Sequence, residues 1–329
     1  MAMQSPPQLS VTDLHKHFHL GHTGLFGGEA RVVRAVDGVS FDLAQGEILA
    51  LVGESGCGKS TLALALMHLE QPTGGRIEFE GREITHVGGA ERKALSRRMQ
   101  MMFQDPYESL NPTQTIGEIV AEPLAVHKLA PDRAERQRRV QQALEDAGLR
   151  PAQNFIHRYP HELSGGQRQR VVIAGALVLE PTLLLADEPV SMLDVSIRAE
   201  VLNLLAELRQ TRGISVLFIT HDLGTVSYFA DRVAVMYLGR IVEIGPTPAV
   251  LLNPQHPYTK ALLSVVPVPN PRLRRQRLIL QGETPNPIAI PAGCRFHPRC
   301  PAAMPACRES DPAFVAVSEG HQAACLLLG

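Results

Sequence analysis

The chain has 329 residues, of which 44% are hydrophobic and 20% charged, and its formal net charge is −1. This length and apolar content suffice for one large domain with an appendage or for two domains. The near-neutral charge argues against a general nucleic-acid-binding protein. No apolar run approaches the roughly 20 residues that span a bilayer. The first residues lack the basic and apolar regions of a secretory signal, so we expect a cytosolic chain.

The first 52 residues predict β-structure. Apolar and polar residues alternate in 9–14, 31–36 and 39–43, and a glycine-rich loop at 21–28 separates the first of these runs from the others. The apolar run at 48–52 then predicts a buried strand, and 61–67 predicts a helix.

The segment between that strand and that helix, residues 53–61, matches the phosphate-binding pattern G-x-x-x-x-G-K-[ST]. Its glycines allow successive backbone N–H groups to point at phosphate oxygens, and the helix directs its positive end at the same anion. Lys59 is expected to reach the β- and γ-phosphates, and Ser60 to ligate Mg²⁺. A chance glycine-rich turn is the weaker alternative, because strand, loop and helix are all present. The predicted nucleotide contacts are Gly53, Ser55, Gly56, Cys57, Gly58, Lys59, Ser60 and Thr61.

Later segments alternate between strand and helix. Strands are expected at 74–81, 99–103, 183–186, 214–219, 232–237 and 240–244, with helical segments over 115–178 and at 195–209. One helix opens at 131–132 and ends at Gly148, and its Arg-rich side is either a solvated face or a docking surface. The alternation predicts a parallel sheet covered by helices on both faces.

Two further segments bear on the chemistry. The apolar strand at 183–186 ends in Asp187 and Glu188, which would hold Mg²⁺ through its water shell and polarise the attacking water, respectively. The segment 163–167, Leu-Ser-Gly-Gly-Gln, opens a helix as a second anion-binding start, or Ser164 is a simple N-cap. One chain does not need two such sites, so the second is expected to serve the nucleotide of another subunit.

These motifs resemble, in order and spacing, the ATP-binding subunits of ABC transporters over about residues 8–250. The resemblance implies an α/β nucleotide-binding domain (8–253) with a RecA-like parallel-sheet core, an antiparallel β subdomain and a helical subdomain at about 106–178. It also implies a head-to-tail dimer that sandwiches two ATP molecules. Each ATP would lie between the phosphate-binding loop of one subunit and the signature residues of the other. Those residues are Ser164, Gly165, Gly166 and Gln167.

The resemblance also implies roles for single residues. Gln104 would sense Mg²⁺ and the attacking water and couple the site to transmembrane subunits, and His221 would contact the γ-phosphate. Asp194 would help to form the dimer interface. Phe18 would stack on adenine, with an ordinary core aromatic as the alternative. Two residues depart from the family pattern: Gly175, where Arg is usual, and Met192, where Ala is commoner.

The tail from residue 254 is proline-rich, with too few apolar residues for its own core. It carries Cys294, Cys300, Cys307 and Cys325, which in a reducing cytosol indicate metal ligands rather than disulfides. The spacing is not that of a zinc finger, but tetrahedral zinc, a [4Fe–4S] cluster and free thiols all stay open. His297 and His321 are substitute ligands or ordinary polar residues, and the basic run 272–277 is a lipid or partner contact or a solvated linker.

Segments 256–263, 282–285 and 291–300 resemble the C-terminal extension (254–329) of dipeptide/oligopeptide importer ATPases, and most of all the second ATPase subunit of dipeptide importers. The resemblance favours the iron–sulfur cluster. It implies an ATPase that powers peptide uptake at the cytoplasmic face of the inner membrane. Its partners would be two transmembrane permease subunits, a paralogous ATPase and an extracytoplasmic binding protein, with no nucleic acid. Nickel or other small-solute importers, a non-transport ABC ATPase and a P-loop kinase are the alternatives.

Overall fold

The computed structural model describes residues 6–21, 31–266, 278, 280 and 282–328. The chain forms two compact units. The first comprises residues 1–44, 48–86 and 219–329, and the second comprises 45–47 and 87–218. Residues 22–28 of the predicted glycine-rich loop and the basic run 272–277 lie outside the described residues.

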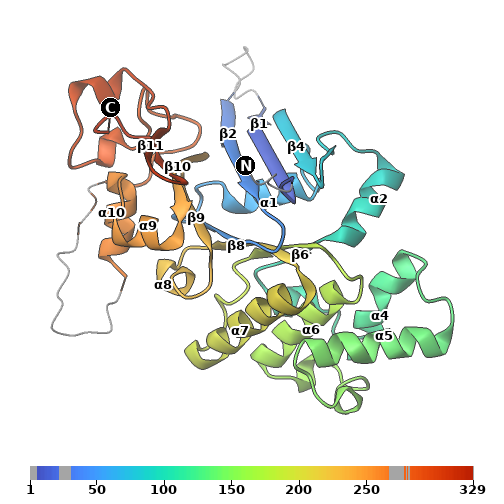
Figure 1. The fold of residues 1–329 in the computed structure, drawn as a ribbon. Coiled ribbons are helices and arrows are strands. Elements are labelled where there is room, and N and C mark those ends of the chain that lie inside the picture. Colours follow the sequence, from blue (N-terminus) through green and yellow to red (C-terminus); the bar gives the residue numbers. More distant parts are fainter. Residues whose placement is uncertain (1–5, 22–30, 267–277, 279, 281, 329) are drawn as a thin grey trace. The chain divides into compact units, whose positions relative to one another are not determined.

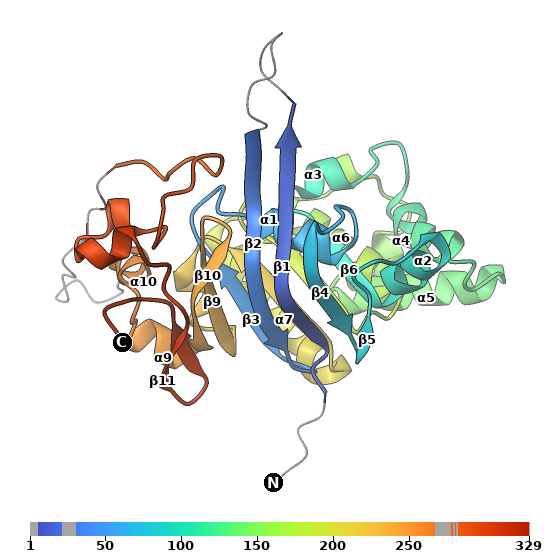
Figure 2. The same ribbon diagram turned by 90° about the horizontal axis from the view of Figure 1, so that it is seen from above.

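An antiparallel four-stranded sheet of the first unit has the order β2-β1-β4-β5 (Figure 2). Its strands are β1 (Leu9–Leu20), β2 (Arg31–Leu43), β4 (Gly74–Phe79) and β5 (Arg82–Glu83). The two runs expected at 31–36 and 39–43 form one strand, which passes through Gly38 at φ = +88°. Only glycine adopts this backbone conformation readily, so the strand continues across an interruption in the alternating pattern.

The other strands of the first unit have the order β11-β12-β10-β9-β3. They are β3 (Ile48–Val52), β9 (Arg232–Tyr237), β10 (Arg240–Pro246), β11 (Val315–Ser318) and β12 (His321–Ala323). The β3–β9 pair is parallel, as predicted, and the other three pairs are antiparallel, so the sheet is mixed rather than wholly parallel. The reason is local, because Leu238 (φ = +42°) and Gly239 (φ = +79°) form a two-residue turn that requires antiparallel strands.

The C-terminal extension shares the core of the first unit. Tyr258 of α10 (Pro257–Ser264) and Phe296 lie against Tyr237 of β9, with ring centroids 4.7 and 5.2 Å from that of Tyr237. All three side chains are less than 2% exposed. The tail therefore does not need a core of its own, because its apolar residues join the core of the first unit. The other helices of this unit are α1 (Lys59–Leu66), α8 (Leu223–Val226) and α9 (Thr247–Leu252), with short 3₁₀ turns at His297–Arg299 and Pro305–Arg308.

A buried carboxylate fastens the extension to strand β10. Glu243 is fully buried and accepts hydrogen bonds from the backbone N–H groups of Gln255 (2.8 Å) and His256 (2.9 Å). Its Oε1 also lies 2.8 Å from Nε2 of His321 on β12. One side chain thus fixes both the loop that enters the extension and the strand that ends it.

The second unit contains the parallel pair β6 (Met99–Met102) and β7 (Leu183–Asp187), with β8 (Ser215–Thr220) next in strand order and reaching the boundary of the unit. Helices α4 (Ile116–Val126), α5 (Arg133–Asp146) and α6 (Gly165–Leu177) pack together (Figure 1). Asp132 caps α5 by accepting a hydrogen bond from the Glu135 N–H. The remaining elements are α2 (Gly89–Arg98), α3 (Pro106–Ser109), α7 (Val195–Arg212) and 3₁₀ turns at Ala152–Asn154 and Pro160–Glu162. Within the described part of the chain, every helix is too short or too polar to cross a membrane.

Candidate nucleotide-binding and hydrolysis site

The phosphate-binding loop joins β3 to α1 in a conformation that only glycine permits at two points. Gly56 has φ = +77° and Gly58 has φ = +108°. A Cβ atom at position 58 would lie 2.0 Å from the Ala35 carbonyl oxygen, far inside van der Waals contact. Any larger residue there would displace the loop from β2, so the glycine requirement read from the motif has a steric cause.

Lys59 is held inside the loop. Its ammonium donates hydrogen bonds to the carbonyl oxygens of Gly53 (2.8 Å) and Glu54 (3.0 Å), and the residue is 5% exposed. Ser60, which the motif assigns to Mg²⁺, is exposed. The Cys57 side chain is 1% exposed, and burial raises the pKa of its thiol. Its backbone N–H donates to the Glu54 carbonyl at 3.3 Å, so Cys57 shapes the loop from within.

Glu54 connects this loop to the C-terminal extension, a contact that the sequence did not predict. Arg299 binds its carboxylate with two hydrogen bonds (2.8 and 3.1 Å), and the Thr284 hydroxyl donates a third (2.7 Å). The Glu54 N–H in turn donates to the Tyr258 hydroxyl at 2.9 Å. Burial opposes ionisation of Glu54, but the hydrogen bonds from Arg299 and Thr284 outweigh it and lower the pKa of the carboxyl. No spacing rule links residue 54 to residue 299, so only the fold reveals this pair.

His221 and Phe18 also belong to the first unit. His221 is exposed and directly follows β8. Phe18 is half-buried in β1, where the Lys16 ammonium lies 4.7 Å from the centre of its ring. Phe18 is thus not among the buried core residues, although its stacking on adenine stays a prediction.

The second unit holds the other predicted hydrolytic residues. Asp187 ends β7 and is 7% exposed, and the half-buried Glu188 follows it at φ = +48°. The backbone N–H and the hydroxyl of Ser191 both donate to the Glu188 carbonyl (3.1 and 3.0 Å), which fixes the turn after the carboxylates. Gln104 is exposed and lies two residues beyond β6.

The signature segment begins α6 with a reciprocal cap. The Ser164 hydroxyl accepts from the Gln167 N–H (3.3 Å), while the Gln167 side chain accepts from the Ser164 N–H (3.1 Å). The simple N-cap considered from the sequence is therefore present. Ser164 is nevertheless exposed, and a Cβ at Gly166 would lie 2.5 Å from the Ile197 side chain. The glycine is required for packing against α7, and the helix start remains accessible.

All four tail cysteines accept backbone hydrogen bonds at sulfur. The donors are the N–H groups of Phe296 to Cys294, Ala302 to Cys300, Met304 to Cys307 and Leu327 to Cys325. Burial, followed by the mutual repulsion of the thiolates, raises the pKa of Cys294 above its ordinary value. His297 Nδ1 lies 2.9 Å from the Cys294 carbonyl, whereas His321 pairs with Glu243.

The distances among the cysteine sulfurs bear on the choice of metal. Two sulfurs bound to one zinc ion at about 2.3 Å lie about 3.8 Å apart. Among the described residues, which include all four cysteines, no three thiol sulfurs lie within 4.8 Å of one another. The thiols are therefore not gathered as they would be around a single tetrahedral ion.

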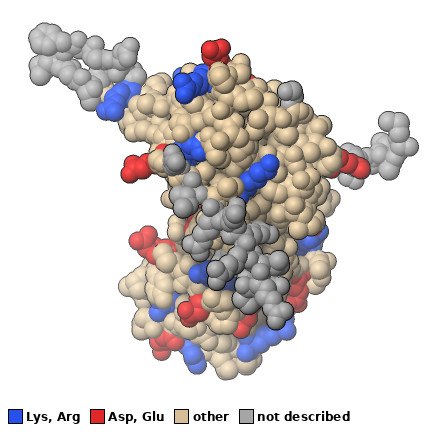
Figure 3. Space-filling view, turned by 90° about the vertical axis from the view of Figure 1, so that its left-hand side faces the viewer, with Lys and Arg blue, Asp and Glu red and all other residues tan. Residues whose placement is uncertain are grey.

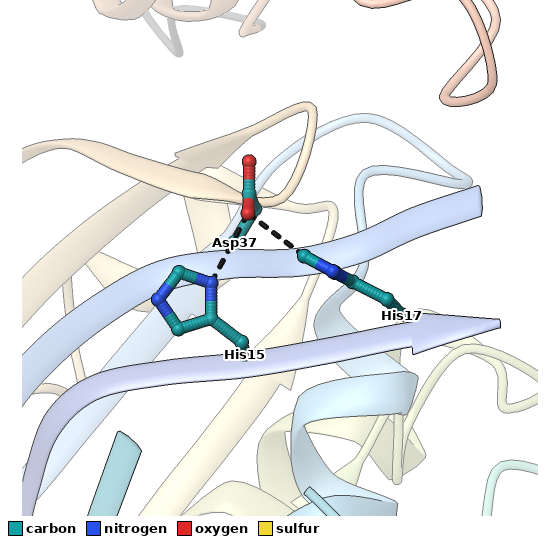
Figure 4. Close-up of side chains that lie close together, drawn as sticks. All are labelled: His15, His17 and Asp37. Atoms are coloured by element: carbon teal, nitrogen blue, oxygen red, sulfur yellow. Dashed lines mark hydrogen bonds and ion pairs between the residues drawn. The ribbon is translucent and has the colours of Figure 1, made fainter. Parts of the chain in front are cut away.

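One titratable cluster lies outside every motif. His15 and His17 of β1 point toward Asp37 of β2, and both imidazoles contact its Oδ1 (Figure 4). Arg295 of the extension pairs with the other carboxylate oxygen of Asp37. The resemblance to ABC transporter ATPases assigns no role to His15, His17 or Asp37.

The loop, the paired carboxylates and the capped signature helix define an ATP-binding cassette of the ABC transporter type, and comparisons with known proteins agree. Residues 36–191 match the family model described as ABC transporter, and residues 242–307 match the one for the C-terminal region of oligopeptide/dipeptide transporters.

Curated relatives match over almost the whole chain. The putative oligopeptide transport ATP-binding protein YkfD of Bacillus subtilis is 48% identical over 99% of this chain and 97% of its own. The probable peptide ABC transporter ATP-binding protein y4tS of Sinorhizobium fredii is 50% identical over 96% of this chain and 89% of its own. Among solved structures, the dimeric cassette MJ0796 bound to ADP and Pi is similar with a TM-score of 0.64 and 27% identity, over 73% of this chain and 98% of that one.

The chain therefore belongs to the ATP-binding subunits of oligopeptide/dipeptide ABC transporters. As an ABC transporter ATPase, it couples ATP hydrolysis to transport.

Proposed function

We propose that this chain powers uptake of di- or oligopeptides by hydrolysing ATP with Glu188 as the general base. Lys59 and the loop N–H groups bind the phosphates, Ser60, Asp187 and Gln104 hold Mg²⁺ and its water, and His221 contacts the γ-phosphate. The observation that carries this proposal is the loop itself, in which Lys59 is fixed by two carbonyl oxygens and Gly58 tolerates no side chain. Relatives whose names state peptide or oligopeptide transport support the substrate class.

Substitution of Glu188 tests the assignment of the base. Glu188→Gln keeps the size of the side chain and removes the carboxylate, so ATP binding should persist while hydrolysis falls to near background. Glu207→Gln, on the same unit but outside the motifs, is the matched control and should hydrolyse ATP at the wild-type rate. Undiminished hydrolysis by Glu188→Gln would reject Glu188 as the base.

A head-to-tail dimer would complete the site. The cassette similar to this chain is dimeric in its ADP-bound structure. On the second unit of this chain, Ser164 is exposed, and so are the apolar Met192 (59%) and Val195 (80%) beside Asp194. Exposed apolar side chains next to a capped helix start suit an interface that closes on a phosphate. We infer that the partner is a paralogue, as in the dipeptide importers whose second ATPase this chain resembles.

The permease subunits would dock on the second unit, at the cytoplasmic face of the inner membrane. A cavity of about 390 Å³ there is lined by Phe103, Val126 and Gly175 together with residues of β6, α4 and α6. Phe103 and Val126 are exposed (46% and 51%), and Phe103 directly precedes Gln104, so an apolar segment inserted there would sense the state of that residue. Because Gly175 replaces a usual Arg, the cavity has no cation at that position.

The cysteine site is proposed to hold a [4Fe–4S] cluster, which would be ligated by Cys294, Cys300, Cys307 and Cys325. Every sulfur has a backbone N–H donor that partly offsets the burial opposing its thiolate, and no three of the sulfurs lie within 4.8 Å of one another as they would around one zinc ion. The test is the iron, acid-labile sulfide and zinc content of anaerobically purified protein, where about four irons and four sulfides per chain are expected. One zinc and no iron would refute the cluster.

A non-transport ABC ATPase acting on nucleic acid is the rival from another class. On the face drawn in Figure 3, the Lys and Arg residues are interspersed with Asp and Glu and do not gather into one basic patch. This distribution, like the net charge of −1, favours a protein partner over nucleic acid. Purification from membranes separates the two, because a transport ATPase brings integral-membrane subunits with it.

A further inference from the structure

The cluster of His15, His17 and Asp37 has the geometry of a preformed ion site. The β1–β2 register places His15 opposite Asp37, and His17 lies two residues further along the same strand. Asp37 Oδ1 is 3.1 Å from His15 Nδ1 and 2.8 Å from His17 Nε2. In the described part of the chain, this is the one group of three or more His, Cys, Asp or Glu residues whose ligand atoms all lie within 4.8 Å of one another.

The position of His15 between two carboxylates suits a cation in this cluster. Its Nδ1 faces Asp37 Oδ1, and its Nε2 faces Asp13 Oδ1, both at 3.1 Å. A neutral imidazole carries a single N–H, so one of its two nitrogens would present a lone pair to a carboxylate oxygen. That repulsive contact is relieved by a second proton on His15 or by a metal ion between Nδ1 and Asp37.

The surrounding contacts are those that orient metal ligands. Asp13 would accept the Nε2 proton of His15, which leaves Nδ1 free to bind a metal, and Arg295 holds the second oxygen of Asp37. Carboxylate–histidine–metal arrangements of this kind fix the tautomer and the orientation of the ligands. Two ligand atoms about 2.1 Å from one tetrahedral ion lie about 3.4 Å apart, so the two distances seen would lengthen by about 0.3–0.6 Å to hold an ion.

The cluster is also accessible. His15 and Asp13 line a cavity of about 260 Å³, together with Arg240, Asp311 and Arg295. The side chains of His15 and His17 are 27% and 25% exposed. Water can therefore complete the coordination shell of an ion held by three protein atoms.

We propose that His15 Nδ1, His17 Nε2 and Asp37 Oδ1 bind one divalent transition-metal ion of the class that prefers mixed imidazole and carboxylate ligands, such as Zn²⁺, Co²⁺ or Ni²⁺. Its ligands are distinct from those proposed for the Mg²⁺ of the nucleotide and from the four cysteines, although Cys294 lines the same cavity. The site joins β1 and β2 and, through Arg295, the C-terminal extension.

Cobalt titration of the full-length protein tests the proposal. Co²⁺ bound by imidazole and carboxylate gives weak visible bands, whereas thiolate ligands add intense charge-transfer absorption in the near ultraviolet, so the two kinds of site are distinguished in one spectrum. One equivalent of Co²⁺ is expected to bind without adding sulfur absorption, whatever the four cysteines bind in addition. His17→Ala should remove that equivalent, and Asp13→Asn should weaken it about 10–100-fold. His19→Ala, an exposed histidine of the same strand, should bind as wild type does.

Two results would overturn the proposal. One is identical Co²⁺ binding by the His17→Ala and His19→Ala variants. The other is a histidine ¹H–¹⁵N spectrum in which His15 is protonated on both nitrogens and stays unchanged when one equivalent of Zn²⁺ is added, since a proton would then be the cation.

Discussion

Loss of the Arg299 guanidinium is expected to weaken both the fold and nucleotide binding, because Arg299 fixes the carboxylate of Glu54 inside the phosphate-binding loop. The Arg299 and Glu54 side chains are 9% and 26% exposed and share two hydrogen bonds. A hydrogen bond to a charged group contributes about 1.5–3 kcal/mol. Because Glu54 is partly exposed, we place the contribution of this ion pair toward the low end of that range. Arg299→Ala should therefore lower the free energy of unfolding by about 2 kcal/mol. Arg299→Lys keeps the charge but loses the planar fork, and should recover less than half of this.

The assay is urea unfolding together with ATP affinity measured by fluorescence titration. Arg308→Ala is the matched control, since Arg308 is an exposed arginine of the same extension. A double-mutant cycle with Glu54→Gln isolates the pairwise energy. An interaction energy below about 0.5 kcal/mol, or an ATP affinity for Arg299→Ala equal to that of Arg308→Ala, would refute the reasoning.

Three further substitutions test separate parts of the structure. Gly175→Ala should raise the free energy of unfolding by about 1 kcal/mol, because glycine is unfavourable inside α6 and the added Cβ meets nothing within 4 Å. An unchanged urea unfolding curve would contradict this. Gly58→Ala should abolish ATP binding while the circular dichroism spectrum stays folded, and normal nucleotide titration would show the Ala35 contact to be harmless. Burial lowers the pKa of His256 to about 3, so the unfolded chain binds a proton that the folded chain does not, and stability falls as the pH drops from about 6.5 toward 3. The loss is at most about 1.4 kcal/mol per pH unit. His256→Asn, which can still cap α10, should flatten this slope in urea titrations at several pH values, and an unchanged slope would exclude His256 as the cause.

The local elements of this fold follow from the sequence because their signals are local. The loop at 53–61 combines glycine spacing with a preceding apolar strand, and Asp132 marks the start of α5 by its capping side chain. The sheet topology required information that a residue pattern does not carry. β12 joins β10 through contacts between segments about 80 residues apart, and no periodicity signals such a pairing.

The candidate site was predicted unevenly for the same reason. Residues of the phosphate-binding loop and the two carboxylates at the end of β7 belong to contiguous motifs, so their positions in the sequence are readable from the chain alone. Glu54 occupies a variable position of its motif, so the motif assigns it no role. Its partner Arg299 belongs to the segment 291–300, which the sequence marks only by its cysteines and by its resemblance to the extension of peptide importer ATPases. His15, His17 and Asp37 come together only through the β1–β2 register, which depends on the conformation of Gly38. Pairings set by register or by tertiary packing became visible only in three dimensions.

The most direct test of the central claim is peptide-stimulated ATP hydrolysis by the complex that this chain forms in its native membrane. The complex would be purified through a tag on the chain in its wild-type and Glu188→Gln forms. We expect integral-membrane subunits to co-purify with both forms, and peptide with its binding protein to stimulate hydrolysis only in the wild type. A chain that purifies without membrane subunits, or a Glu188→Gln complex that hydrolyses ATP as fast as the wild type, would contradict the account.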